Sequence, residues 1–337
     1  MTDPFVTYKS LTKIYAAMVL GGLLLILIGY FVADMYLPTS TWALVTYLIC
    51  FIGLPVLVTA IGFYIGWYGK KSTINYSDPT WTMEPVQLKI DEAKTLVRQN
   101  KRKYWRLVSN SSYWTFFIPI ALLLFIAGLP VYIYMEHPTL GGLGPWLSAI
   151  SLSLVYVVAS VGALLATSNA ASEDFDILLA RETIALAKAQ EHIPGLSYIR
   201  VVFDKGMRDG YEIYESPRVI ARIDGIEHDA YIESWTEDLH AVSRVLCRLM
   251  ETEKLPQVVW WWIGTDRNYR KFVGKDEKGY YVRLPVKSKV VHPGVKDIGV
   301  VLENAVAIII LEWLETRGPN ENLSQVLTEL NATPPEG

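Results

Sequence analysis

The sequence of 337 residues lacks the short motifs that mark the common nucleotide, metal and hydrolase sites. It contains no phosphate-binding P-loop, GxGxxG, HExxH, CxxC or GxSxG pattern. Its two cysteines, Cys50 and Cys247, are far apart and lack metal-type spacing, so we expect two reduced, buried thiols. The net charge of −3 points to no class of partner, and we expect no cofactor and no nucleic-acid ligand.

Charged residues are also missing from four long apolar runs. None of these runs contains Asp, Glu, Lys, Arg or His; they are Ile14–Ala33, Trp42–Tyr68, Tyr113–Tyr134 and Trp146–Thr167. Because about 20 apolar residues cross the hydrocarbon core, we predict four transmembrane helices, joined by short connections into two hairpins. Pumps and ion-coupled transporters need ionisable groups near the membrane centre, so their absence argues against both classes. A pore gated by apolar side chains is still compatible with it.

Lys and Arg are absent from the connections Asp34–Thr41 and Met135–Pro145, but nine of them lie in Gly69–Ser112. Cationic residues are retained on the cytoplasmic side during insertion. We therefore predict that this basic loop and both termini are cytoplasmic, in a plasma membrane or a bacterial inner membrane.

Small residues in the spans indicate where helices pack closely or bend. Close packing is predicted at a small-xxx-small pair and at a GxxxG, which are Ala17, Gly21, Gly62 and Gly66. Gly53-Leu54-Pro55 and Gly128-Leu129-Pro130 repeat one tripeptide in the second and third spans. Pro55 and Pro130 are therefore either tolerated kinks or hinges of a gate or inverted repeat.

The basic loop contains an amphipathic segment, Glu84–Val108, that we predict to be one helix which continues toward the third span. Lys101, Arg102 and Lys103 form a cluster that either binds anionic lipid headgroups or serves only to fix the topology. After the fourth span, Ser168–His192 has a helical pattern, and we expect a helical stalk that ends at Pro194-Gly195.

The remaining residues predict a cytoplasmic α+β domain of antiparallel hairpins covered by helices. Hairpins are expected at 198–215, 218–232 and 270–284, and Trp260–Trp262 as part of a central buried strand. A capping box at Ser234–Glu237 predicts a helix to Lys254. Val295–Thr316 is expected to be a buried helix that ends at Gly318, with Asn320 capping a last short helix.

The predicted fold is therefore an all-α four-helix membrane module followed by a cytoplasmic α+β domain. Its segments are a transmembrane hairpin (1–68), a basic loop (69–112), a second hairpin (113–167), a stalk (168–195), the α+β domain (196–330) and a disordered tail (331–337).

One cluster could hold a divalent cation. Asp224, Glu227, His228 and Asp229 lie within six positions and have suitable side chains, but an Asp-Gly hairpin turn at the same place explains them equally. His240 and His292 are isolated, and nothing beside them in the sequence marks a catalytic base.

Three functions fit these patterns. The leading hypothesis is a non-catalytic membrane subunit that anchors a cytoplasmic docking domain within a larger secretion, conjugation or respiratory complex. Its partners would be membrane lipids and other membrane or cytoplasmic subunits, in a homo- or hetero-oligomer. The alternatives are an oligomeric channel gated by its cytoplasmic domain, and a membrane-bound metal-dependent enzyme that uses residues 224–229.

Overall fold

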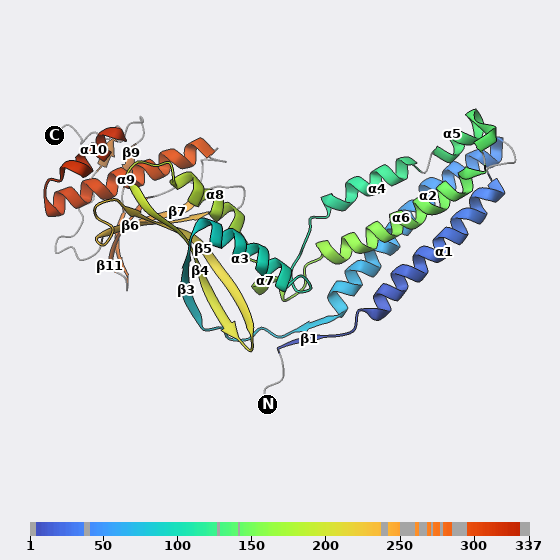
Figure 1. The fold of residues 1–337 in the computed structure, drawn as a ribbon, viewed down its shortest axis with the longest axis horizontal. Coiled ribbons are helices and arrows are strands. Elements are labelled where there is room, and N and C mark those ends of the chain that lie inside the picture. Colours follow the sequence, from blue (N-terminus) through green and yellow to red (C-terminus); the bar gives the residue numbers. More distant parts are fainter. Residues whose placement is uncertain are drawn as a thin grey trace. The chain divides into compact units, whose positions relative to one another are not determined.

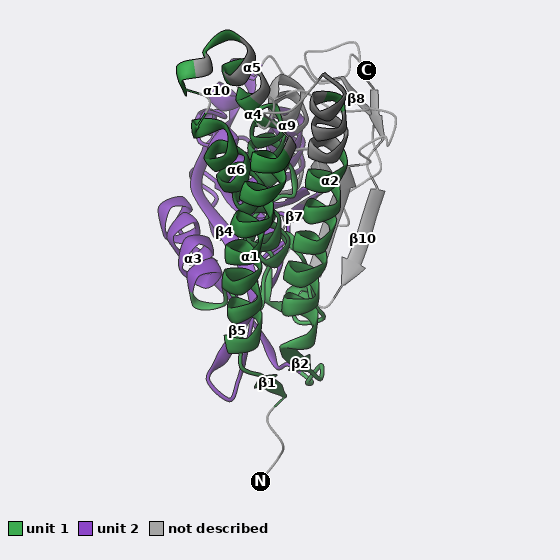
Figure 2. Ribbon diagram, turned by 90° about the vertical axis from the view of Figure 1, so that its right-hand side faces the viewer, with its two compact units in different colours: residues 1–80, 103–176 green, residues 81–102, 177–337 purple. Residues whose placement is uncertain are grey.

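The computed structural model describes residues 5–36, 41–126, 129–140, 142–236, 242–249, 260–262, 268–270, 272–276, 279–284 and 295–330. Contacts divide the chain into two compact units (Figure 2). The helical unit is residues 1–80 with 103–176, and the sheet unit is residues 81–102 with 177–337. Part of the expected basic loop, residues 81–102, therefore belongs to the sheet unit.

The helical unit is built around its last long helix (Figure 1). Its main helices are α1 (Thr12–Tyr36), α2 (Thr41–Ser72), α4 (Trp114–Ile126), α5 (Leu129–Glu136) and α6 (Leu143–Ala166). Each of the other four contacts α6. In the most apolar window, 61% of the α6 residues are buried against 22% of those in α1, so α6 is the central helix.

Two of the predicted spans, within Thr12–Met35 and Leu143–Ala166, are single helices long and apolar enough to cross a membrane. At 1.5 Å per residue, 24 residues extend about 36 Å, more than the hydrocarbon thickness of about 30 Å. The third predicted span is divided between α4 and α5, and the 13 residues of α4 reach only about 20 Å. In α2, the side chains of residues 41–44 and 46–52 lie outside the description.

Short elements close one end of the helical unit. Strand β1 (Val6–Tyr8) pairs antiparallel with β2 (Ile74–Tyr76), and α7 (Ser172–Phe175) follows α6. The ring of Phe175 lies 4.7 Å from that of Tyr104, and the Tyr76 hydroxyl donates a hydrogen bond to Asp174.

Between α5 and α6, the chain forms a 3₁₀ turn, Pro138–Leu140.

The sheet unit contains a seven-stranded antiparallel sheet in the order β10-β11-β7-β6-β5-β4-β3. The strands are β3 (Met83–Leu88), β4 (Leu196–Arg208), β5 (Tyr211–Ile223), β6 (Ala230–Thr236), β7 (Val242–Leu249), β10 (Phe272–Asp276) and β11 (Gly279–Leu284). Its helices are α3 (Ile90–Lys103), α8 (Ala180–Gln190), α9 (Val295–Arg317) and α10 (Glu321–Glu329). One face of the sheet and these helices share a continuous core around Phe203, Val219 and Ile232. The α+β assignment is thus confirmed.

The predicted hairpins are present, with longer strands than expected. Strands β4 and β5 meet at Asp209-Gly210, where both residues have positive φ (48° and 80°), as a tight two-residue turn requires. Strands β10 and β11 also pair as predicted. The last helices agree as well: Gly318 ends α9 with φ 102°, and the Asn320 side chain accepts hydrogen bonds from the backbone N–H groups of 322 and 323.

The predicted continuous helix Glu84–Val108 is wrong. Its first part is β3, an edge strand that pairs with β4, and α3 ends at Lys103 before a turn. Val86 and Leu88 alternate as strand residues, and the four-residue spacing of Val86 from Ile90 also fits a helical stripe, so the pattern is ambiguous. Pro85 is tolerated because β3 lies at the sheet edge.

The predicted stalk is also not one helix. After α6 ends at Ala166, the chain forms the short α7 and then α8, which begins after Leu179 in the left-handed region (φ 58°). Helix α8 packs on β4, β5 and β6. Its apolar positions therefore belong to the core of the sheet unit and do not extend the fourth span.

The predicted helix from Ser234 to Lys254 is wrong as well. Ser234 and Thr236 belong to β6, and 242–249 form β7, which pairs with β6 on one side and β11 on the other. Buried Val245 and Cys247 alternate along β7, and ladder hydrogen bonds to two neighbours outweigh a local capping signal. Residues 237–241 and 250–254 lie outside the described residues.

Trp260–Trp262 is a strand, β8, as predicted, but it pairs with β9 (Asn268–Arg270) in a two-stranded sheet and is not a central strand of the large sheet. His240, His292 and the tail 331–337 lie outside the described part of the chain, as does the side chain of Cys50.

Candidate functional site: the basic end of the helical unit

Cationic and aromatic side chains gather where α1 begins and α2 ends. We call this set, Tyr8, Lys9, Lys70 and Arg106, the basic end. At its centre is Lys70, which is only 4% exposed although it is charged. Its Nζ donates hydrogen bonds to the backbone oxygens of Val108 (2.8 Å) and Trp105 (3.5 Å).

Arg106 lies beside this lysine. Its guanidinium carbon is 4.5 Å from the centre of the Tyr8 ring, and its NH2 donates to the Lys9 carbonyl oxygen at 3.4 Å. Burial, followed by the positive charge of Arg106, lowers the pKa of Lys70 from 10.5 to about 8. Two cations are thus held together by carbonyls and a ring, without a carboxylate.

A small half-open cavity lies against these two cations. Its wall combines cationic, aromatic and apolar side chains, and the lining residues are Leu11, Lys70, Thr73, Ile74, Trp105, Arg106 and Leu164. No acidic residue is among them. The chain's pattern could have indicated this site, because Lys70 and Arg106 each follow closely after tryptophan, at positions 67 and 105. Sequence reasoning singled out only Lys101–Lys103.

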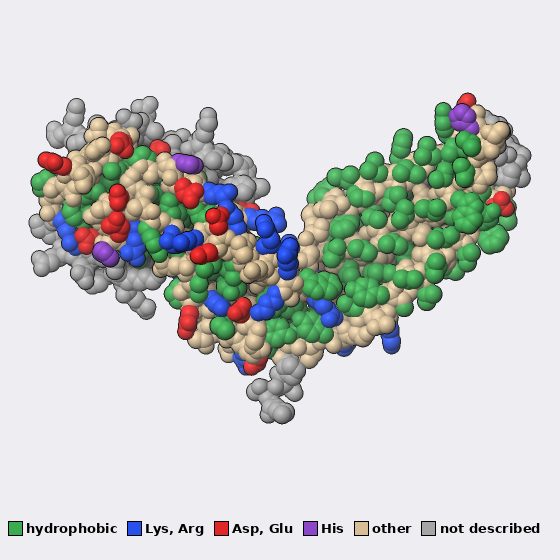
Figure 3. All heavy atoms as spheres, viewed as in Figure 1, with side chains coloured by type: hydrophobic (Ala, Val, Ile, Leu, Met, Phe, Trp, Pro, Cys, Tyr) green, Lys and Arg blue, Asp and Glu red, His purple; other side chains and the backbone are tan. Residues whose placement is uncertain are grey.

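The predicted headgroup cluster lies in the last turn of α3, with Lys101 and Arg102 in the sheet unit and Lys103 in the helical unit. Lys101 is half-buried, Arg102 and Lys103 are exposed, and the Lys103 Nζ lies 5.1 Å from the centre of the Tyr104 ring. Figure 3 shows Lys and Arg side chains concentrated away from the hydrophobic face of the helical unit. The three cations stay candidates for headgroup contact.

The four candidate metal ligands do not converge. Asp229 accepts a hydrogen bond from the Trp313 indole (3.2 Å) and pairs with Arg317 (3.4 Å), which attaches the connection after β5 to α9. Hydrogen bonds from its own backbone N–H and from the Gly225 N–H lower the pKa of the Glu227 carboxyl. Among the residues described, no group of three or more His, Cys, Asp or Glu side chains could hold a metal. Asp224 and His228 therefore do not form a metal site with Glu227 and Asp229.

The small residues predicted for helix packing lie against α6. A Cβ on Gly62 would approach the Tyr156 carbonyl oxygen to 2.8 Å, and one on Gly66 would collide with that of Ser160. On α1, Gly21 faces the Tyr156 ring, and the Tyr156 hydroxyl donates to the carbonyl oxygen of Ala17 (3.0 Å). These contacts allow close approach of backbones.

The two hinge candidates differ. Helix α2 runs through Pro55, whose carbonyl oxygen accepts a hydrogen bond from the Thr59 hydroxyl (2.7 Å). Pro130 is the second residue of α5, a position that needs no N–H donor. Pro119, inside α4, is a further proline that the sequence interpretation left out.

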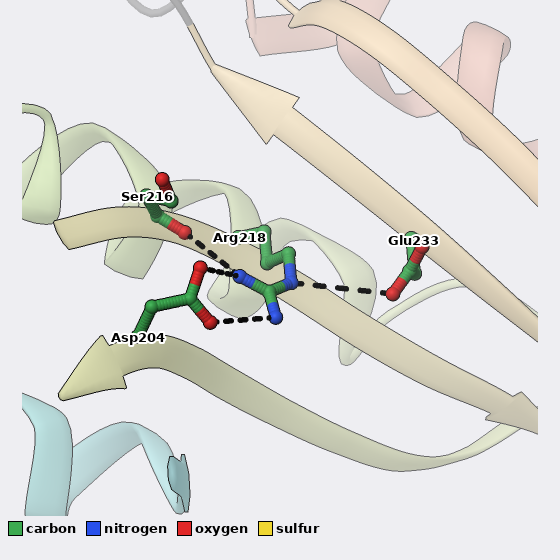
Figure 4. Close-up of polar contacts among 4 residues, drawn as sticks. All are labelled: Asp204, Ser216, Arg218 and Glu233. Carbon is green, nitrogen blue, oxygen red and sulfur yellow. Dashed lines mark hydrogen bonds and ion pairs between the residues drawn. The ribbon is translucent and has the colours of Figure 1, made fainter. Parts of the chain in front are cut away.

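A buried ionic network joins three strands of the sheet unit (Figure 4). Arg218 on β5 forms two 3.0 Å hydrogen bonds with the Asp204 carboxylate on β4, and its Nε lies 4.0 Å from Glu233 on β6. Arg218 also donates to the Ser216 carbonyl oxygen. Sequence reasoning placed Asp204 in a turn, because the bulge between Val202 and Asp204 that positions it has no local signal. We assign this network a structural role.

Cys247 is buried, as the sequence predicted. Cys247 lies in the core of the sheet unit, where burial raises the pKa of its thiol to about 12. It is therefore an unreactive thiol, although it stands on a strand and not on the predicted helix.

No family model, curated protein or solved structure matches the chain, so function is inferred from its own residues.

Proposed function

We propose that the chain is a non-catalytic integral membrane subunit whose helical unit anchors a cytoplasmic docking domain within a larger complex. The observation that carries this proposal is the outward-facing apolar surface of the helical unit (Figure 3). Exposed residues include Leu20 (66%), Phe31 (65%), Ile118 (66%) and Phe125 (79%), a surface that lipid solvates and water does not.

The proposed topology has four spans with both termini in the cytoplasm. The lengths of α1 and α6 support it, as does the absence of Lys and Arg from 34–41 and 135–145. Activity reporters fused after Glu136 and after Gly337 test it. We expect the first reporter to signal from outside and the second from the cytoplasm, and an external signal from the Gly337 fusion contradicts the scheme.

Anchoring is tested by extraction. The full chain should stay in the membrane fraction after alkaline carbonate treatment, which releases peripheral proteins. Replacing Leu20, Leu24 and Leu27 with Asp puts three charges on the exposed face of α1 and should lower membrane retention. Replacing Asp78 with Asn and Glu84 and Glu92 with Gln also changes three charges, but outside the spans, and should leave membrane retention unchanged.

Membership of a complex is tested by size. The separate core of the sheet unit supports a role as an independent docking surface. Mild-detergent extraction of the native protein followed by size measurement should give a mass well above that of one chain in its micelle. A lone monomer without co-purifying partners argues against the proposal.

A further inference from the structure

The strongest unassigned feature is the pair of cations at the basic end. Lys70 is buried and Arg106 half-buried, and within the described residues neither takes part in an ion pair. Asp174, an acid of the same unit, accepts a hydrogen bond from the Tyr76 hydroxyl. Burying a cation without an opposite charge is costly, and a second cation beside it adds repulsion. A bound anion would relieve both costs.

The cavity beside the two cations has the composition of a headgroup site. Among the lining residues, Arg106 and Lys70 supply hydrogen-bond donors, and Leu11, Ile74 and Leu164 supply apolar surface. Lys70 gives two of its three N–H groups to backbone oxygens, which leaves one donor for a ligand. A phosphate attached to an apolar chain matches both surfaces.

The cavity has room for about one water molecule, whereas pockets for complete small molecules usually measure about 300–1,000 Å³. It therefore excludes a whole nucleotide or cofactor and admits only a phosphate oxygen of a ligand that lies at its open side.

The position of the cavity matches the level of lipid phosphates under the proposed topology. It lies where α1 begins, α2 ends and α6 ends, on the side assigned to the cytoplasm. Exposed Trp67, Tyr68 and Trp105 surround this level. Amphipathic rings prefer the membrane interface.

We propose that Lys70 and Arg106 together bind the phosphate of an anionic lipid headgroup at the open side of this cavity, with Leu11, Ile74 and Leu164 against its glycerol and upper acyl region. This inference rests on the proposed membrane placement of the helical unit. It adds a defined pocket to the loose surface contact expected from Lys101–Lys103.

The experiment measures lipid retention by the full chain in nanodiscs. Native mass spectrometry compares phosphatidylglycerol with phosphatidylcholine for the wild type, Lys70→Met, Arg106→Gln and Lys71→Gln. Lys71 is exposed, sits at the same helix end and stacks 6.0 Å from the Trp67 ring, so it is the matched control. Arg106→Gln guards against misfolding, because Arg106 is only half-buried.

We expect the wild type to retain phosphatidylglycerol over phosphatidylcholine, and Lys70→Met or Arg106→Gln to lose that preference by about tenfold or more. Lys71→Gln should keep it. Equal losses in all three variants, or none in any, overturn the pocket. If inorganic phosphate at equal concentration displaces the lipid, the site binds free phosphate and the lipid assignment is wrong. Carbonate extraction of the same wild-type protein separates these outcomes from failure of the membrane placement.

Discussion

Large apolar side chains are exposed on the helical unit but buried in the sheet unit. In the helical unit, Leu20, Phe31 and Phe125 are more than 60% exposed, while glycine, alanine and serine occupy the contacts with α6. In the sheet unit, Phe203, Ile223 and Ile232 are fully buried in one continuous core. Burial of large apolar groups drives folding only where the alternative is water. Where lipid is the alternative, close contact between small residues must hold helices together.

The clusters of buried residues differ in the same way. Among the described residues of the helical unit, three clusters have three buried members each, such as Val58, Leu152 and Tyr156, whereas the sheet unit has a cluster shared by its strands and four helices. The helical unit therefore depends on backbone proximity, and the sheet unit on filled volume. The following predictions test that difference, from the largest expected effect to the smallest.

Gly66→Leu should disrupt the helical unit most. Its Cβ would collide with the Ser160 carbonyl oxygen and lie 2.8 Å from the Ala163 Cβ, so α2 and α6 must separate. Overpacking usually costs about 1–3 kcal/mol, and a collision with backbone should cost at least about 3 kcal/mol. Thermal unfolding in detergent micelles measures this.

Gly53→Leu is the control in the same helix, because a Cβ there meets no atom of the described residues within 4 Å. Equal destabilisation by both changes would contradict backbone proximity as the source of helical-unit stability.

Arg218→Met should destabilise the sheet unit by about 3 kcal/mol. The change removes the bidentate partner of Asp204 and leaves Glu233, only 2% exposed, without that cation nearby. Arg181→Met, on the exposed face of α8, should change the free energy of unfolding by less than about 0.5 kcal/mol. Urea unfolding followed by circular dichroism measures both, and equal effects would show that the network stabilises nothing.

Raising the pH from 8 to 10.5 should stabilise the helical unit through Lys70. Burial lowers the pKa of this lysine to about 8 in the folded chain, against 10.5 in an unfolded one. In that window the unfolded chain binds more protons, so stability rises with pH, by about 1–2 kcal/mol after solvent screening. Other groups titrate there too, so the measurement is the difference in pH dependence between the wild type and Lys70→Met in lipid-free micelles. If the stability of the wild type and of Lys70→Met depends on pH in the same way, the lowered pKa of Lys70 is contradicted.

Tyr156→Phe should have the smallest effect. It removes the hydroxyl that donates to the Ala17 carbonyl oxygen and keeps the ring that faces Gly21. Hydrogen bonds between membrane helices average about 0.6 kcal/mol, and we expect that loss. Tyr64→Phe, on the exposed face of α2, serves as control. A loss well above 1 kcal/mol would show that polar contacts, and not small-residue packing, dominate between α1 and α6.

Local signals in the sequence were enough for several elements. Asp209-Gly210 and Gly225 mark turns whose positive φ only small or Asx-type residues adopt readily, and Asn320 marks a helix start through its own backbone hydrogen bonds. Gly62 and Gly66 lie on the contact face of α2 because small size at helical spacing is itself the signal. The sequence predicted only part of the candidate site, because nothing in the local sequence indicates that Lys70 is buried.

The sequence by itself determined the apolar runs, the charge asymmetry between the connections and the turn chemistry, since each depends on neighbours a few residues apart. Only the tertiary structure decided that Val86 belongs to an edge strand, that 242–249 is a strand between two others, and that Asp204 meets Arg218. Strand pairing and ionic contacts join residues distant along the chain, and their free energy exists only when the partner is in place. The contact of Lys70 and Arg106, 36 positions apart, likewise exists only in the folded chain. The repulsion between the two cations and the anion site that we propose both arise from the cavity that they share.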